Sequence, residues 1–364
     1  MTRRFAVALL TLAALSAGPA HAFGPKGHKT VGAVADQRLA NRPVATKIHD
    51  LLDGLTLEEA AVLPDEIKSW DSKPPSDPHA FHLKDHPLIE ADLVKFWEKH
   101  NKKSGADYHR NFHFTDVPVG GNSKYGDGTT GRGDFDLIHM TNACLKVLQS
   151  GKEDKELAIT PRVAVILLAH YVGDIHQPLH VGSQYFDKDG KTMNPDKDKG
   201  MAFGDVGGNN LTLILKSESE RGQAHTSVNL HSYWDDDTVD TAYQIVLEEI
   251  AKGRSAPAGT ITEATIKKHL AMNEPAAWKM KPTLSLDKYA ETWADEILPV
   301  AGEAHARLEF KNVIPHGKSV NGFAHEKDPQ PDGVAYGDWS GLVVRKSLHR
   351  AGWRLADLLE KAIP

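Results

Sequence analysis

Apolar residues recur at helical spacing along much of the chain, and the strongest run follows the pair Thr160-Pro161. From Val163 to Ile175 nearly every residue is apolar, which predicts a helix buried on all sides. Thr160 suits the N-cap, Pro161 suits the first helical position, and Pro178 ends the pattern. His170 and Asp174 lie within this run, so two polar side chains are predicted inside the protein, where each needs a partner.

Similar spacing elsewhere predicts further helices, separated by stretches rich in Gly and Pro. The predicted helices cover residues 28–53 (broken near Pro43), 58–70, 135–148, 286–308 and 342–362. Residues 71–90 and 120–133 have the composition of loops, and residues 183–206 form a polar insertion rich in Lys and Asp. With neither an internal repeat nor a linker, the pattern favours a mainly α fold in a single domain.

One strand is predicted, and it follows a turn-forming run. Leu211-Thr-Leu-Ile-Leu215 comes directly after Gly207-Gly208-Asn209-Asn210. A mostly apolar run of this length after Gly and Asn is typical of a strand in a hairpin. A small β-hairpin is therefore expected beside the helices.

The first 22 residues have the pattern of a secretory signal peptide. Arg3 and Arg4 precede the apolar stretch Phe5–Ala17, and Ala20-His21-Ala22 fits a cleavage site. The predicted mature chain is therefore 23–364, periplasmic or extracellular; an uncleaved anchor is the alternative. No other segment is apolar and long enough to span a bilayer, so no stable membrane association is expected.

Charge and cysteine content narrow the classes of function. Residues 1–22 carry two Arg and no acidic residue, so their removal changes the formal net charge from −6 to −8. Such a chain lacks the basic surface expected for tight duplex binding, although bound metal ions would add positive charge at a site. The only cysteine, Cys144, excludes an internal disulfide, so stability must come from the core and from any bound metal.

Two His–Asp pairs point to metal chemistry. His170 and Asp174 are four residues apart, as are His231 and Asp235, which on a helix places each pair on one face. Imidazole and carboxylate groups are suitable zinc ligands, and His180 adds a fifth. Five candidates exceed the needs of one ion, so a cluster is favoured over the alternative of buried His–Asp hydrogen bonds.

Other segments offer further candidate ligands. His113 and Asp116 lie in Asn111-Phe-His-Phe-Thr-Asp116, and Asp65 lies in Leu63-Pro-Asp-Glu66, where it also fits a helix cap. After cleavage, Phe23 would offer an α-amine and a carbonyl five residues before His28, and an amine of pKa near ~8 can lose its proton to a metal. Five histidines without such spacing are predicted to lie on the surface: His79, His82, His86, His100 and His109.

Together these motifs resemble the zinc-dependent, single-strand-specific nuclease/3′-nucleotidase family typified by mung bean nuclease, whose fold is that of the phospholipase C/nuclease superfamily. The matching motifs, in order, are Phe23…Gly27-His28, Asp65, His113…Asp116, His170-x-x-x-Asp174-Ile-His-Gln-Pro-Leu-His180, Gly-Gly-Asn209, His231-x-x-Trp-Asp235 and Arg350-Ala-Gly-Trp-Arg-Leu-Ala356. They cover most of residues 23–245 and the final helix. The resemblance implies a helical bundle of the phospholipase C/nuclease type that carries three Zn²⁺.

The resemblance also implies how the zinc ions are held. One would be bound by Asp65, His113, His170 and a bridging Asp174. A second would use the amine and carbonyl of Phe23, with His28 and the same Asp174. The third would be bound by His180, His231 and Asp235.

Substrate contacts follow from the same motifs. Lys68, Asp116 and Asn209 are the side chains implied in catalysis: Lys68 would steady the phosphoryl transition state and Asn209 would contact the phosphate. Phe114 and Asp116 would stack on, and hydrogen-bond to, the base 5′ to the scissile bond. The implied substrates are RNA, single-stranded DNA and 3′-nucleotides, and the implied products carry 5′-phosphates. Surface exposure of Lys68 and a purely structural role for Phe114 are the alternatives.

Two other functions remain open from the sequence. A phospholipase C-like phosphodiesterase could use the same three-zinc site, and an exported zinc-binding protein could keep the ligands without hydrolysis. The chain also departs from the family pattern, since Phe23 stands where a Trp is typical and residues 183–206 follow His180 directly. This insertion is expected to border the cleft and to influence which substrates bind.

Overall fold

The computed structural model describes residues 23–216, 228–253 and 261–364, so the predicted signal peptide lies outside the described residues. Helices dominate the described chain, which confirms the prediction of a mainly α fold. The longer helices are α1 (Gly24–Leu39), α2 (Pro43–Leu51), α5 (Pro87–His100), α6 (Leu137–Ser150), α7 (Pro161–Ile175), α10 (Thr238–Gly253), α11 (Glu263–Met272), α12 (Tyr289–Ala306) and α13 (Tyr336–Ala362).

Short helical turns connect these helices and carry several of the predicted site residues. They are α3 (Leu57–Ala60), α4 (Leu63–Glu66), η1 (Ile67–Asp71), η2 (His109–His113), η3 (Tyr125–Asp127), η4 (Pro178–His180), α9 (Leu230–Ser232), η5 (Tyr233–Asp237) and η7 (Leu286–Lys288). The helix predicted over 58–70 is thus divided into three short pieces, because Pro64 lacks the N–H needed to continue the first of them.

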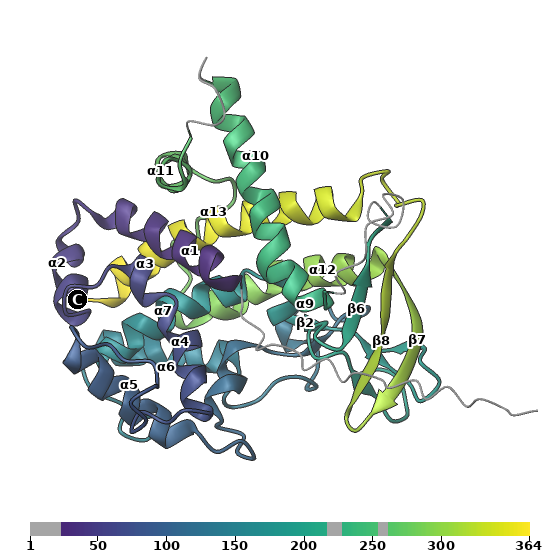
Figure 1. Ribbon diagram of the computed structural model, residues 1–364, viewed down its shortest axis with the longest axis horizontal. Helices are drawn as coiled ribbons and strands as arrows, with labels where there is room; N and C mark the ends of the chain where they lie inside the picture. The colour runs from purple at the N-terminus through teal and green to yellow at the C-terminus, as the bar shows by residue number, and fades with distance from the viewer. Residues whose placement is uncertain (1–22, 217–227, 254–260) are drawn as a thin grey trace, which may run out of the picture.

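Helix α7 is the centre of the fold, as its apolar sequence predicts. The Thr160 hydroxyl accepts a hydrogen bond from the Val163 N–H, and Pro161 occupies the first turn. Every residue from Val163 to Ile175 is buried. Helices α1, α5, α6 and α13 all contact α7 (Figure 1), so the polar His170 and Asp174 lie in the interior.

Helices α1 and α13 pack along each other and cover one side of α7 (Figure 1). The predicted break at Pro43 separates α1 from α2. The C-terminus ends near α2, where Lys47 Nζ donates to the carbonyl of Pro364. The buried apolar side chains form one cluster that extends from Phe23 to Ala362. No helix of the described residues is both long enough and apolar enough to cross a membrane.

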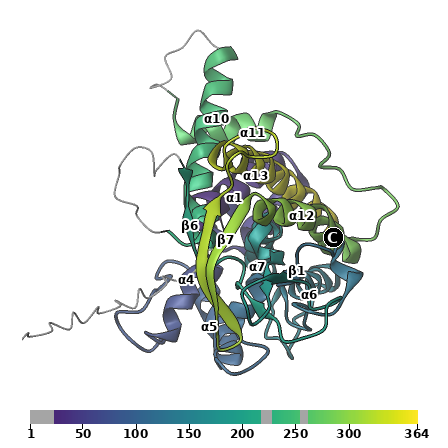
Figure 2. The same cartoon turned by 90° about the vertical axis from the view of Figure 1, so that its right-hand side faces the viewer.

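A β-sheet packs at one end of the helices, and it is larger than the single hairpin expected. Its strands are β3 (Tyr185–Phe186), β4 (Thr192–Met193), β5 (Phe203–Gly204), β6 (Leu211–Ile214), β7 (Leu308–His316) and β8 (Ser319–Glu326). They follow the order β4-β3-β5-β8-β6, with β7 antiparallel to β8. Figure 2 shows β6 and β7 in front of the helices. A separate pair joins β1 (Val117–Pro118) to β2 (Gly182–Ser183) in parallel.

The strand predicted at 211–215 is confirmed as β6, but its main partner is distant in sequence. β6 runs parallel to β8, with Leu211 opposite Gly322. Its antiparallel contact with the segment that follows, within the described residues, consists of a bridge between Thr212 and Asn229 and a bond from the Leu213 N–H to the Val228 carbonyl. The long hairpin of the fold is β7–β8, which sequence analysis missed because its residues alternate only irregularly between buried and exposed.

Several local predictions are wrong. The segment 71–90 was predicted to be loop, but α5 begins at Pro87. No element was predicted for the stretch that forms α11. His100 and His109 are almost fully buried rather than on the surface. The ring nitrogens of His100 bond to the carbonyls of Asp107 and Leu157. These bonds satisfy the imidazole in the core, which residue spacing alone does not reveal.

Candidate metal centre and substrate pocket

The predicted side-chain ligands converge from seven helical elements on one buried region. Three groups of His and Asp bring their ligand atoms within 4.8 Å of one another: His28–Asp65–His170, His113–His170–Asp174 and His180–His231–Asp235. All eight of these side chains are buried. They come from α1, α4, η2, α7, η4, α9 and η5, so the fold brings together residues far apart in sequence.

Asp174 lies at the centre of the first two groups. Its Oδ1 is 3.3 Å from His28 Nε2, and its Oδ2 is 3.2 Å from His113 Nδ1 and 3.4 Å from His170 Nε2. His113 Nδ1 and His170 Nε2 are themselves 2.9 Å apart. Asp65 Oδ1 is 3.6 Å from His170 Nε2. Each carboxylate oxygen of Asp174 thus faces a different set of nitrogens, as a bridging ligand requires.

The packing of α1 against α7 explains how His28 reaches this group. The His28 and His170 rings stack with centroids 3.7 Å apart. Gly173 leaves the space for this contact, because a Cβ on it would lie 2.9 Å from His28 Nδ1. At the start of α1, Gly24 packs closely against η5: a Cβ on Gly24 would lie 3.2 Å from the Asp235 carbonyl oxygen. The buried Phe23, which precedes α1, therefore lies next to the ligand-bearing segment η5.

The third group combines two imidazoles and a carboxylate. His180 Nε2 and His231 Nε2 are 3.0 Å apart, and Asp235 Oδ2 is 3.4 Å from His231 Nε2. Gln177 Nε2 donates to Asp235 Oδ1 over 2.9 Å, while Gln177 Oε1 accepts from the Leu179 N–H. Gln177 therefore orients Asp235 so that its other oxygen faces the histidines.

Backbone carbonyls fix the orientation of three of the imidazoles. The Nδ1 atoms of His170, His180 and His231 lie 2.6–2.7 Å from the carbonyl oxygens of Ala61, His113 and Gly207. A carbonyl accepts but does not donate, so each Nδ1 carries the proton. Each Nε2 then presents its lone pair to the neighbouring ligands. This arrangement is typical of metal-bound histidine.

Burial lowers the pKa of several histidines in these groups and raises the pKa of two of the aspartates. Desolvation lowers the pKa of His170 and His231 to about 4 and holds that of His180 well below its usual range, so these imidazoles are neutral at pH 7. Desolvation raises the pKa of Asp174 to about 8 and that of Asp235 well above its usual range. Neutral imidazoles are ready to bind a metal, whereas the two carboxylates need a nearby cation to stay ionised.

These residues fit zinc on two observations. Imidazole nitrogens and carboxylate oxygens are among the ligands that Zn²⁺ commonly takes in catalytic sites. Asp235 Oδ2 and both carboxylate oxygens of Asp174 are buried and accept no hydrogen bond within the described part of the chain. Such atoms are costly in a protein interior without a cation.

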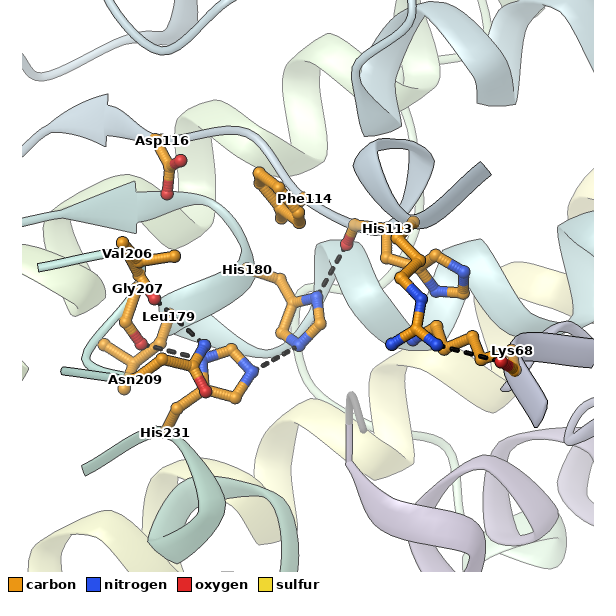
Figure 3. Close-up of a pocket in the computed structure, with 11 residues that line it drawn as sticks. Lys68, His113, Phe114, Asp116, Leu179, His180, Val206, Gly207, Asn209 and His231 are labelled. Carbon is orange, nitrogen blue, oxygen red and sulfur yellow. Dashed lines mark hydrogen bonds between the residues drawn. The ribbon is translucent and has the colours of Figure 1, made fainter. Parts of the chain in front are cut away.

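A pocket opens directly onto these ligands (Figure 3). Its volume is about 200 Å³. It is lined by Lys68, Arg110, His113, Phe114, Asp116, Leu179, His180, Val206, Gly207, Asn209 and His231. All four predicted substrate-contacting residues, Lys68, Phe114, Asp116 and Asn209, therefore line the same opening as three of the histidines.

The model of the S1/P1 nuclease family matches residues 23–364 of this chain. The chain belongs to the S1/P1 nuclease family. Two plant relatives are Endonuclease 5 and Endonuclease 3 of Arabidopsis thaliana. Both are 26% identical to this chain, over 251 residues for Endonuclease 5 and over 250 residues for Endonuclease 3. The alignments cover 66% of this chain but only 64% and 63% of those relatives. Zinc dependence is typical of S1/P1 nucleases, and the His/Asp groups are able to hold metal.

Lys68 is buried in this S1/P1 family member, so the alternative of an exposed surface lysine is wrong. Only 6% of the residue is exposed, and Nζ lies 2.5 Å from Asp65 Oδ1. The spacing i, i+3 across the α4–η1 turn brings the ammonium to the carboxylate. A predicted metal ligand and a predicted catalytic cation are thus held side by side.

Asp116 is held by the segment that follows His180. Ser183 Oγ donates to Asp116 Oδ1 over 2.6 Å, and the Gly207 N–H donates to the same Ser183 hydroxyl. Burial raises the pKa of Asp116 to about 6; the Ser183 hydrogen bond lowers it and the negative charge of Asp205 raises it. Asp205 is itself buried and bonded to His305.

The insertion 183–206 borders the pocket as expected, but it is only partly polar. Ser183, Phe186 and Asp205 are fully buried, and Val206 lines the pocket with a φ of 57°. A β-branched residue in this left-handed conformation is strained, so the surrounding structure must hold it there. Asn209 follows in the same turn, where its amide Nδ2 donates to the Val206 carbonyl.

Sequence reasoning missed four residues that shape this site: Arg110, Gln177, Ser183 and Val206. Gln177 lies within the His-Gln-Pro-Leu-His180 motif, between the predicted ligands Asp174 and His180, and this position could have indicated a role in the site. Tertiary packing alone brings Arg110 and Val206 to the pocket and Ser183 to Asp116. By contrast, His176 lies within the same motif but is not among the grouped ligands: its ring bonds to the Val172 carbonyl and to Arg354.

Proposed function

We propose that the protein is an exported, zinc-dependent endonuclease that hydrolyses RNA and single-stranded DNA to products with 5′-phosphates, and that it also removes the phosphate of 3′-nucleotides. One observation carries the proposal: a single pocket joins the buried His/Asp groups to an aromatic ring and a carboxylate, Phe114 and Asp116 (Figure 3). Family membership supports nuclease chemistry. The shared pocket supports a nucleotide as the group that reaches it.

We propose three zinc ions. Asp65, His113, His170 and Asp174 would hold one, and His28, Asp174 and the amine and carbonyl of Phe23 would hold the second. His180, His231 and Asp235 would hold the third. Bound at these residues, zinc would supply an activated water and neutralise negative charge on the phosphoryl group and the leaving oxygen.

The protein side chains then bind and orient the substrate. Lys68, buried beside Asp65, would donate an N–H to a phosphoryl oxygen as negative charge increases there. The second N–H of the Asn209 amide is directed by the bond of this amide to Val206 and would donate to the same phosphate. A desolvated pocket strengthens both contacts.

Base binding would explain a preference for single strands. Phe114 would stack on the base 5′ to the scissile bond, which contributes about 1–3 kcal/mol and requires that base to be unpaired. The Asp116 carboxylate would accept N–H bonds from the edge of the base. Ser183 positions this carboxylate at one end of the pocket.

The decisive experiment assays the purified mature protein on RNA, single- and double-stranded DNA, 3′-AMP and a choline phospholipid. The proposal expects turnover of RNA, single-stranded DNA and 3′-AMP, with 5′-phosphates on the polymer products. Turnover of the lipid alone would instead establish a phospholipase C-like phosphodiesterase. Zinc content without any hydrolysis would reduce the protein to an exported metal-binding protein.

Cleavage after Ala22 is tested separately. If the Phe23 amine is a ligand, a mature protein that retains two extra residues before Phe23 should bind one zinc fewer and lose most activity. A Phe23→Trp variant of the correctly cleaved chain is the control, because it keeps the amine and the carbonyl. Equal zinc content and activity in the extended and cleaved proteins would refute the assignment of Phe23. N-terminal sequencing of exported protein checks the cleavage site itself.

A further inference from the structure

A second cation lines the pocket beside Lys68, and the proposed chemistry does not use it. Arg110 lies in η2, three residues before the ligand His113, and its side chain is 35% exposed. It therefore combines contact with the pocket with access to solvent. Neither the metal ligands nor the base-binding pair requires it.

The Arg110 guanidinium is held in a fixed orientation by two bonds. Nε donates to Asp71 Oδ2 over 2.6 Å, and Nη2 donates to the Lys68 carbonyl over 2.8 Å. Nη1 donates to no acceptor in the described part of the chain. Because a guanidinium has five N–H donors, these two bonds leave further donors on its outer edge. An arginine fixed in this way is well suited to bind a phosphate.

Asp71 is a rigid anchor for this arginine. Its buried carboxylate also accepts bonds from the Tyr108 hydroxyl, the Trp97 indole N–H and His109 Nε2. Asp71 ends the same turn that carries Lys68, so one short segment fixes both cations. Arg110 is therefore already ordered before substrate binds, so binding loses little of its side-chain conformational entropy.

The positions of Lys68 and Arg110 indicate which part of a bound strand would lie next to them. In Figure 3, Lys68 and His113 lie at the opposite end of the pocket from Asp116 and Asn209. Arg110 is bonded to Lys68, so it belongs to that end. If Phe114 and Asp116 bind the base 5′ to the scissile bond, the strand on the 3′ side continues past the metal ligands towards Arg110.

We propose that Arg110 binds the phosphodiester next to the scissile one on its 3′ side, and that this contact favours polynucleotides over substrates with a single phosphate. The proposal rests on the nuclease function proposed above. Arg110 would act as a binding residue that mainly lowers KM for longer strands. It would contribute little to the hydrolysis of a 3′-nucleotide, which has no phosphate at that position.

The test compares Arg110→Gln and Arg110→Lys with the wild type on three substrates: 3′-AMP, the dinucleoside monophosphate ApA, and a single-stranded decamer. For Arg110→Gln we expect kcat/KM on the decamer to fall about tenfold through KM, the loss of one charge-assisted hydrogen bond. Turnover of 3′-AMP and ApA should stay within about twofold, and Arg110→Lys should give an intermediate loss.

Arg162→Gln is the matched control. Arg162 is also partly buried, lies 3.5 Å from the Asp92 carboxylate and donates to a backbone carbonyl, that of Leu51, but it does not line the pocket. This variant should leave the ratio between decamer and ApA unchanged. Thermal unfolding and zinc content, measured on each variant, identify any general disturbance of the fold.

The wild type offers a second measurement that does not depend on how a variant folds. Extension of ApA on its 3′ side, to ApApA, should lower KM for cleavage of the first bond. An equal loss on all three substrates, or no loss on the decamer, would overturn the assignment of Arg110, as would equal KM values for ApA and ApApA. Absence of wild-type activity on every nucleic acid would instead refute the proposed function, so the two failures are distinguishable.

Discussion

His180 Nε2 and His231 Nε2 face each other across 3.0 Å, although both rings use their other nitrogen to donate to a backbone carbonyl. Two neutral imidazoles in this state direct lone pairs at each other and cannot form a hydrogen bond. Protonation of one ring would relieve the conflict, but desolvation and the neighbouring ring lower the pKa of His180 well below its usual range. A bound cation between the nitrogens removes the conflict and also compensates Asp235.

Zinc binding should therefore release protons. Burial raises the pKa of Asp174 to about 8 in the metal-free protein, so at pH 7 this carboxyl is mostly protonated and must lose its proton to become a ligand. Calorimetric titration of zinc into chelator-treated protein, in buffers of different ionisation enthalpy, should show net proton release at pH 7 that decreases above pH 8. The restored metal should also raise the unfolding temperature by several degrees. Proton uptake on zinc binding would contradict this assignment.

Gln177 should matter for the metal although it is not a ligand. Gln177→Leu removes the amide that bonds Asp235 Oδ1, so the carboxylate loses its fixed orientation. Loss of an outer partner of this kind reduces metal affinity or activity by about 10–100-fold. Zinc affinity from competition with a chromophoric chelator, and kcat on 3′-AMP, measure the effect. The exposed Gln149→Leu serves as the control and should change neither quantity.

Asp71 should contribute strongly to stability. Four side chains donate to this buried carboxylate, and their hydrogen bonds hold its pKa well below its usual range against the desolvation that raises it. Replacement by Asn leaves Arg110 without its charged partner and should cost about 3 kcal/mol at pH 7. The free energy of unfolding in urea measures this cost. Asp240→Asn, which breaks the exposed pair with Lys26, should cost less than about 1 kcal/mol.

The low pKa of Asp71 determines how its contribution to the free energy of unfolding changes with pH. The unfolded chain binds this proton near pH 4, and the folded protein binds it only at lower pH. The stabilisation from Asp71 is therefore fully present above about pH 5 and is lost as the pH falls below 4. The difference in unfolding free energy between wild type and Asp71→Asn should shrink in that acidic range. A constant difference from pH 7 to pH 3 would contradict an ionised Asp71.

The same residues show how far sequence reasoning reaches. His170 and Asp174 were predictable because helical periodicity places them together on one buried face. Asp71 and Arg110 are 39 positions apart and share no local pattern, so only the packing of η1 against η2 brings them together. The resemblance to a family supplied the order of the predicted ligands and four of the residues that line the pocket, but it did not indicate Arg110. The pairing of β6 with β8 could not be predicted for a similar reason, since the two strands are separated by more than a hundred residues.

Ser183 should set the acidic limit of activity on substrates that carry a base. Its hydroxyl donates to Asp116, whose pKa burial raises to about 6, and this bond stabilises the ionised carboxylate. In Ser183→Ala the pKa of Asp116 should rise further, because the lowering contribution is lost while burial and the charge of Asp205 remain. If ionised Asp116 binds the base, the acidic limb of the kcat/KM profile for 3′-AMP moves to higher pH in Ser183→Ala. Ser183→Thr keeps a hydroxyl and should restore the wild-type profile, whereas a uniform loss at every pH would show that Ser183 supports only the fold of the Gly207 turn.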